Sequence, residues 1–303
     1  MASSDGEEVE ILERSSCFGG GAWSLHHYSK GPLVVEARSV GEWFRYRVRA
    51  GRSDLALASS RRSAGIEAVA VRGDEVEITY AGLGGGGVGA TVSRSRAGDV
   101  LRSSVSESGG GKVGRGTIVL PRRERIAVGV DDTDSKTEGA TWSLVHNIAA
   151  KVDRPEARYV SHALVQLFPV PTKTQNCVST VVEFAALPGK ADPMLAEFRD
   201  LLERYTVSEE TGMAVYRGFD PSPLMEYSQL CRTERIAYDL AIETAARTGT
   251  EVVIAGRGLI RGSCGDPLVR RPLASVTPGD EGKGEMLERA RWADSRRGRP
   301  LLN

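Results

Sequence analysis

The pattern of hydrophobic and polar positions changes near residue 120. Before that point, short apolar runs alternate with clusters of glycine. A short run rich in β-branched and aromatic residues, bounded by turn residues, is typical of a strand. Such runs predict strands at residues 32–37, 43–50, 66–71, 75–80 and 113–120, with a hairpin turn at Arg72-Gly73-Asp74. No segment here has a convincing helical period. Residues 1–120 are therefore predicted to form a mostly β, glycine-rich domain.

The segments after residue 120 alternate between strand-like and helix-like patterns. Helices are predicted at 141–152, from Asp192 to 205, and from 223 to Gly249. Asp192 precedes a proline and suits a helix start, and Gly249 suits a helix end. Strands are predicted at 125–130, 159–167, 178–186, 213–216 and 251–255.

The order strand, helix, strand, strand, helix, strand between residues 125 and 216 is that of a ferredoxin-like split βαβ arrangement. We therefore predict an α+β fold. Residues 121–277 would form an α/β sandwich of ferredoxin-like (βαββαβ) order, with an additional helix and strand. Residues 278–303 would be a polar tail.

Composition narrows the class of protein only slightly. The 40 basic and 40 acidic residues balance, so net charge gives no argument for a nucleic-acid coat or a membrane surface. The N-terminus is acidic, unlike a signal peptide, and no apolar run approaches the roughly 20 residues that span a bilayer. The four cysteines lie too far apart for a zinc knuckle. We expect a cytoplasmic protein, with no membrane contact and reduced thiols.

An acidic cluster follows the first strand after residue 120. In Asp131-Asp132-Thr133-Asp134-Ser135, three carboxylates and two hydroxyls stand within five residues. Like charges so close together are unfavourable unless a cation neutralises them. Mg²⁺ suits this role, because it binds one or two carboxylates together with phosphates and water. The alternative is a solvated acidic turn that only caps the next helix. The density of carboxylates favours a site for a nucleotide and Mg²⁺.

Two further segments carry groups that suit phosphate. Pro171-Thr172-Lys173-Thr174-Gln175-Asn176 supplies a lysine, hydroxyls and amides, although an ordinary polar hairpin loop explains it equally well. Gly256-Arg257-Gly258 places an arginine between two glycines, where a simple turn is the favoured alternative. The glycine clusters before residue 120 lack the Gly-Lys-Ser/Thr of a Walker loop.

These segments carry a resemblance. Val128 to Ser135, Glu138-Gly139-Ala140-Thr141, Pro171 to Thr174 and Gly256 to Ile260 resemble, in this order, the kinase-like domain of archaeal tRNA(Ile) agmatidine synthetase. Over nearly the whole chain, the sequence also resembles the methanogenesis marker protein 11 family. The glycine-rich stretch 81–91 and Thr211-Gly212-Met213-Ala214-Val215 carry this second resemblance.

The synthetase resemblance implies the use of ATP and Mg²⁺, and a phosphoryl transfer that activates a carbonyl before an amine displaces it. It implies metal ligands at Asp131, Asp132 and Asp134, and catalytic roles for Asp132, Thr141 and Lys173. Contacts to nucleotide or phosphate would come from Thr133, Ser135, Gly139, Lys173, Thr174, Asn176 and Arg257.

Some features argue against tRNA as the acceptor. Gln175 and Asn176 stand where the synthetase tends to have arginine and glycine, and Ala140 stands in place of a cysteine. We recognise neither a cysteine-rich zinc module nor an oligonucleotide-binding domain. We therefore expect a nucleotide and an unknown small-molecule or macromolecular acceptor as partners, with tRNA disfavoured.

The leading hypothesis is an ATP- and Mg²⁺-dependent phosphoryl-transfer or carbonyl-activating enzyme of methanogen physiology. It predicts that the three aspartates, Thr141 and Lys173 converge on one cleft at the interface of the two domains. The runner-up is a nucleotide-binding, non-enzymatic assembly or regulatory factor with a protein partner in methanogenesis. A haloacid-dehalogenase-like phosphatase is disfavoured, because its Asp-x-Asp spacing does not fit Asp132-Thr133-Asp134-Ser135.

Overall fold

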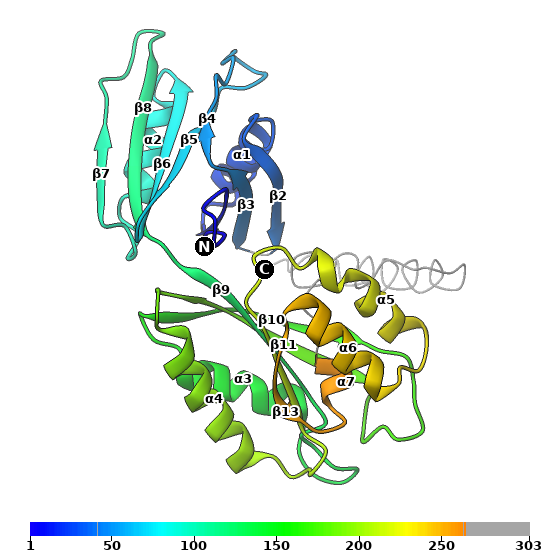
Figure 1. The fold of residues 1–303 in the computed structure, drawn as a ribbon. Coiled ribbons are helices and arrows are strands. Elements are labelled where there is room, and N and C mark those ends of the chain that lie inside the picture. Colours follow the sequence, from blue (N-terminus) through cyan, green and yellow to red (C-terminus); the bar gives the residue numbers. More distant parts are fainter. Residues whose placement is uncertain (41, 263, 265–303) are drawn as a thin grey trace, which may run out of the picture.

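The computed structural model describes residues 1–40, 42–262 and 264 (Figure 1). The tail predicted at 278–303, and residues 265–277 of the predicted α/β sandwich, lie outside the described residues. The α+β fold class is confirmed, since helices accompany three antiparallel sheets.

Two sheets share one core in the N-terminal part of the chain. Their apolar faces meet around Ile11, Tyr46, Ile66, Ile78 and Ile118. The first sheet has the order β1-β3-β2, and the second has the order β4-β5-β6-β8-β7. Their strands are β1 (Glu8–Arg14), β2 (Val34–Val40), β3 (Trp43–Arg49), β4 (Gly51–Arg52), β5 (Ala64–Arg72), β6 (Glu75–Leu83), β7 (Arg102–Val105) and β8 (Val113–Pro121).

All five strands predicted in this part are present, within a few residues of their predicted ends. The sequence analysis missed β1, β4 and β7. β1 alternates charged and apolar residues, β4 has two residues, and every residue of β7 is exposed. Such strands carry little hydrophobic signal.

Two helices in this part correct the expectation that it contains none. They are α1 (Phe18–Tyr28) and α2 (Gly86–Arg94), and both lie in glycine clusters. Glycine is a poor helix former, which hid them. Close packing explains the glycines: an added Cβ at Gly21 would lie 2.2 Å from the Phe44 ring, and one at Gly87 would lie 2.1 Å from the Gly114 carbonyl oxygen.

The C-terminal sheet has the predicted split βαβ order. It runs β10-β11-β9-β12-β13, with every neighbouring pair antiparallel. β11 lies between the two strands that α3 connects, and β9 lies between the two that α4 connects, as a split arrangement requires. The elements are β9 (Glu124–Asp131), α3 (Thr141–Val152), β10 (Ala157–Gln166), β11 (Val178–Ala186), α4 (Ala191–Tyr205), β12 (Gly212–Tyr216) and β13 (Glu251–Ala255).

The helices α3 and α4 cover one face of this sheet and bury its apolar side chains (Figure 1). The other face carries η1 (Ser222–Leu224), α5 (Met225–Thr233), α6 (Tyr238–Thr248) and the short α7 (Leu259–Gly262). The single helix predicted from 223 to 249 is broken, because Glu234 and Ala237 adopt extended backbone between α5 and α6. Gly249 ends α6 in the left-handed region, at φ 70°, as predicted.

A buried ion-pair network joins the N-terminal part to the C-terminal sheet. Glu183 of β11 accepts hydrogen bonds from Arg45 of β3 at 2.6 Å and from Arg125 of β9 at 2.7 Å. The side chains of Glu183 and Arg125 are 0% exposed. All three charged groups lie on the sheet face opposite α3 and α4, near the start of β9.

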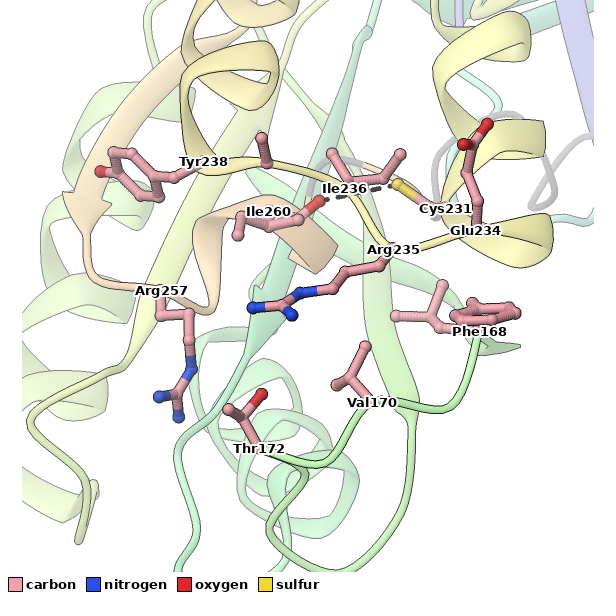
Figure 2. A pocket seen from close by; sticks show the side chains of 12 residues that line it. Phe168, Val170, Thr172, Cys231, Glu234, Arg235, Ile236, Tyr238, Arg257 and Ile260 are labelled. Atoms are coloured by element: carbon pink, nitrogen blue, oxygen red, sulfur yellow. Dashed lines mark hydrogen bonds between the residues drawn. The ribbon is translucent and has the colours of Figure 1, made fainter.

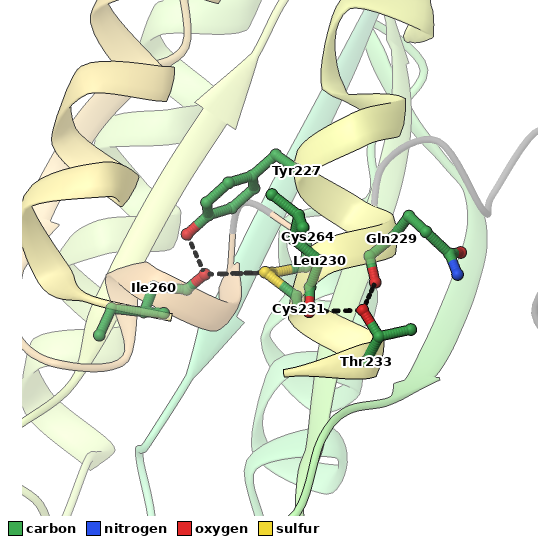
Figure 3. The surroundings of a disulfide bond; sticks show 7 residues. All are labelled: Tyr227, Gln229, Leu230, Cys231, Thr233, Ile260 and Cys264. Atoms are coloured by element: carbon green, nitrogen blue, oxygen red, sulfur yellow. Dashed lines mark hydrogen bonds between the residues drawn. A yellow bond between two sulfur atoms is a disulfide. The ribbon is translucent and has the colours of Figure 1, made fainter. Parts of the chain in front are cut away.

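A disulfide joins Cys231 of α5 to Cys264, just beyond α7 (Figure 3). The expectation that all thiols are reduced is therefore wrong for this pair, while Cys17 and Cys177 are free thiols. The two cysteines are 33 residues apart, so only the fold brings them together. In the part of the chain that the structure describes, no helix is long and apolar enough to cross a membrane.

Reducing this disulfide should lower the free energy of unfolding by about 3 kcal/mol. Opening a crosslink across 33 residues returns conformational entropy to the unfolded chain. Urea unfolding with and without dithiothreitol measures the change. A Cys17→Ser variant is the control, because its exposed free thiol should leave the response to reductant unchanged. An equal unfolding midpoint in both conditions, or four alkylated thiols in the unreduced denatured protein, would contradict the pairing.

Candidate functional site

The acidic cluster forms a buried turn at the end of β9, next to the middle of the C-terminal sheet. Asp131, Asp132 and Thr133 are each less than 5% exposed, and Asp134 is 9% exposed. Asp132 adopts φ 53°, and its N–H donates to the Asp131 carboxylate at 2.8 Å. Aspartate tolerates this left-handed conformation better than most residues. Burial distinguishes this turn from the solvated acidic turn that the sequence left open.

The first residue of α3 holds the turn from one side. Thr141 Oγ1 accepts from the Thr133 N–H at 3.2 Å and from the Thr133 hydroxyl at 3.1 Å. Because this oxygen accepts twice, its own hydrogen is directed toward a third partner. Thr141 lies in the first turn of α3, where backbone N–H groups suit an anion.

Residues between α4 and β12 hold the turn from another side. Thr206 donates its hydroxyl to the Thr133 carbonyl oxygen at 3.2 Å, and the Val207 N–H donates to the same oxygen at 3.1 Å. The Thr211 hydroxyl donates to the Asp132 carbonyl oxygen at 3.2 Å. The sequence analysis missed Thr206 and Thr211 as site residues, because no local motif marks them.

The loop between β10 and β11 lies against the turn. The Thr174 hydroxyl donates to Asp134 Oδ1 at 2.6 Å. Gln175 Nε2 donates to the carbonyl oxygens of Ser135 at 3.2 Å and Gly139 at 2.8 Å. Gln175, noted in the sequence only as a departure from the synthetase, is thus the residue that fastens this loop.

Lys173 and Asn176, in the same loop, are exposed, and the structure shows no side-chain contact between either and the acidic turn. Ser135 and Gly139 lie nearby in a local turn. The Ser135 hydroxyl oxygen accepts from the Glu138 N–H at 2.9 Å, and Gly139 adopts φ 84°. The convergence predicted from the sequence therefore includes Thr141 and Thr174, but not the side chains of Lys173 and Asn176.

Arg257 completes the arrangement from the loop after β13. Its Nε donates to Asp132 Oδ2 at 3.2 Å, and its backbone N–H donates to Glu210 at 3.2 Å. The Arg257 side chain is 37% exposed, whereas that of Asp132 is 2% exposed. One face of the guanidinium is therefore open to a ligand.

The three aspartates do not form a preassembled metal cage. Across residues 1–40, 42–262 and 264, no group of three or more histidine, cysteine, aspartate or glutamate side chains is arranged to hold an ion. Thr174 binds the Asp134 carboxylate, and Arg257 binds that of Asp132. Mg²⁺ commonly takes one or two carboxylates and completes its shell with substrate phosphates. These residues fit an ion that arrives with a nucleotide better than a resident one.

A cavity of about 500 Å³ opens beside Arg257 (Figure 2). Its walls are mainly apolar, with Phe168, Val170 and Ile260 among them. Arg235, from the break between α5 and α6, enters it from the other side. The sequence analysis missed Arg235, because it treated residues 223–249 as one continuous helix.

The expectation that the site lies at the interface of the two parts is wrong. The junction adjoins the start of β9, whereas the acidic turn follows its end, and eight residues of strand span about 25 Å. A separate cleft of about 720 Å³ lies at the junction, lined by residues such as Trp43, Arg123 and Arg158. None of the site residues named from the sequence lines it.

Residues 127–256 match the family model of the TiaS TCKD domain. This match confirms a synthetase-like domain. Over 261 residues, the chain is 38% identical to the uncharacterized protein MJ0921 of Methanocaldococcus jannaschii, covering 84% of this chain and 87% of that protein.

Similar solved structures include a complex of TiaS with an isoleucine tRNA and ATP, with a TM-score of 0.43 and 18% identity over 48% of this chain. A complex of TiaS with the same tRNA, AMPCPP and agmatine has a TM-score of 0.41 and 16% identity over 46% of this chain. The match spans about a third of each of those chains, at 36% and 35%.

Proposed function

Because this chain belongs to the same family as protein MJ0921 of Methanocaldococcus jannaschii, and contains a match to the TiaS TCKD domain, we propose a nucleotide-dependent enzyme. It binds ATP with Mg²⁺ at the acidic turn and activates an acceptor by phosphoryl transfer. One observation carries the proposal: three segments far apart in the sequence supply Thr174, Thr211 and Arg257 to one buried acidic turn. A turn that only caps a helix needs no arginine from 125 residues away.

Phosphoryl transfer depends mainly on positioning and on the neutralisation of charge. Bound with the nucleotide, Mg²⁺ would neutralise phosphate charge, and Asp131 and Asp132 are the carboxylates placed to hold it. Thr174 orients the Asp134 carboxylate. Thr141 accepts two hydrogen bonds from Thr133 and so presents its own hydroxyl hydrogen to a phosphate oxygen. Arg257 steadies Asp132 and keeps one face open to an anion.

The other residues named from the sequence take lesser parts in this proposal. The catalytic role of Lys173 and the nucleotide contact of Asn176 require the loop between β10 and β11 to rearrange, because both side chains are exposed. Ser135 and Gly139 shape the backbone before α3.

The acceptor is the part of the proposal that the comparisons help least. The solved TiaS structures hold an isoleucine tRNA and agmatine as bound partners of those proteins, so the comparisons do not support the argument against tRNA. Membership of the methanogenesis marker protein 11 family and a place in methanogen physiology stay predictions from the sequence resemblance.

Calorimetric titration of ATP, with and without Mg²⁺, tests the nucleotide site. We expect binding that requires Mg²⁺ and weakens by roughly 100-fold in an Asp132→Asn variant, since a carboxylate next to the ion is lost. Asparagine keeps the size of the side chain and tolerates the positive φ at this position. Asp200→Asn, at an exposed position of α4, is the matched control and should bind as the wild type does.

Folded wild-type protein that binds no ATP would refute this proposal. Binding without turnover in the presence of candidate acceptors would instead favour the non-enzymatic assembly or regulatory factor.

A further inference from the structure

The cavity beside Arg257 has a composition that suits one class of ligand. Its walls are formed largely by Leu167, Phe168, Val170, Ile236 and Ile260, and its volume of about 500 Å³ suits a small molecule. Two guanidinium groups, those of Arg235 and Arg257, are its cationic groups (Figure 2). An apolar cavity with arginines at its opening matches a ligand that combines an apolar body with an anionic end.

Arg235 has no structural task of its own in the described part of the chain. There its side chain makes no hydrogen bond and no ion pair, and it extends into the cavity toward Arg257 and Thr172 (Figure 2). Glu234 also borders the cavity, but its carboxylate points away from both guanidinium groups. A guanidinium offers donors in a rigid fork that matches a carboxylate or phosphate, so Arg235 is placed to receive an anion.

The cavity and the acidic turn share Arg257. That side chain borders the cavity and also donates to Asp132. An anion held by Arg235 would therefore lie next to the place where the proposed function puts the phosphates of ATP. Adenine is a poorer match for this cavity, because the base is neutral, while the charged groups that enter the cavity can only donate hydrogen bonds.

We propose that this cavity binds the acceptor of the ATP-dependent reaction, and that the acceptor is a small organic anion with a flat, apolar body. Arg235 holds its carboxylate or phosphate, and the apolar walls hold its body. This inference rests on the proposed function for the word acceptor. The existence of an anion pocket at Arg235 rests on the cavity alone.

Two fluorescent probes with nearly the same aromatic body test the pocket. 8-Anilino-1-naphthalenesulfonate carries a sulfonate, and N-phenyl-1-naphthylamine carries no charge. We expect the full chain to bind one molecule of the sulfonate, and Arg235→Gln to weaken that binding about tenfold through the loss of a charge-assisted contact. The neutral probe should bind wild type and variant equally. Arg204→Gln, at an exposed position of α4 on the opposite face of the sheet, removes the same charge and should change neither probe.

Calorimetry of ATP with Mg²⁺ on the same three proteins separates the pocket from the nucleotide site. Unchanged ATP affinity in Arg235→Gln, together with weakened sulfonate binding, supports an acceptor pocket distinct from the nucleotide. Weakened ATP binding in Arg235→Gln overturns it, because the cavity would then hold part of the nucleotide. Equal sulfonate affinity in Arg235→Gln and wild type also overturns it. If wild type binds no ATP but Arg235→Gln loses the sulfonate, the proposed function fails while the anion pocket stands.

Discussion

Replacing Glu183 by leucine should lower the free energy of unfolding by about 4 kcal/mol. The carboxylate is 0% exposed and accepts from Arg45, Arg125 and Ser161 at 2.6–2.9 Å. Leucine fills a similar volume but leaves two buried guanidinium groups without this carboxylate. Removing one member of a buried ion pair is costly, because the remaining charge keeps its desolvation penalty. Urea unfolding followed by circular dichroism measures the loss.

Two further variants show whether charge is the cause. A triple change of Glu183, Arg45 and Arg125 to leucine should recover much of the loss, since apolar residues often replace a buried ion network at little cost. Glu197→Leu is the control, because its pair with Arg154 lies near the surface and should contribute about 1 kcal/mol or less. A Glu183→Leu protein as stable as the wild type would show that the network does not stabilise this junction.

The second large effect is expected at Gly129, in the middle of β9. An added Cβ there would lie 1.8 Å from the carbonyl oxygen of Gly262 in α7. Both sides of this contact are backbone, so neither can move cheaply. Gly129→Ala should push α7 off the sheet at a cost of about 3 kcal/mol, as overpacking of a tight contact does. It should also weaken ATP binding, because Arg257 precedes α7 by two residues and would no longer reach Asp132.

Unfolding and ATP calorimetry on one protein preparation test both consequences. Gly89→Ala is the matched control: it lies in α2, its added Cβ would meet nothing within 4 Å, and a gain of up to about 1 kcal/mol is expected there. Normal stability in Gly129→Ala would contradict the close packing of α7. Reduced stability with unaltered ATP affinity would instead contradict the role of Arg257 at the nucleotide site.

The strands and helices that bury one continuous apolar face were the ones that the sequence could predict. β11 is buried along almost its whole length, and α4 places Leu195, Phe198 and Leu202 on one side. The helices α1 and α2 were missed, because tertiary packing overrides the low helix propensity of their glycines. The break near Arg235 was missed, since nothing local in that segment marks it as a helix end.

The candidate site divides in the same way between local and distant information. The acidic turn was visible, because three carboxylates follow an apolar strand within a few residues. The contacts that Thr206, Thr211 and Gln175 make with it depend on elements folding back over dozens of residues, which no local pattern records. Arg257 was named only from its flanking glycines, and its partner Asp132 was not foreseen.

The Cys231–Cys264 disulfide bears on how ligands for this protein should be sought. Cys231 lines the cavity that Arg235 enters, and its partner follows α7, whose first residues form the opposite wall. A compound screen in a buffer with a thiol reductant would present this cavity with one wall untethered, and weakly binding compounds would lose affinity there. Libraries should therefore be screened on the oxidised chain first, and hits re-measured after reduction. The difference in affinity between the two then shows how far each compound depends on that wall.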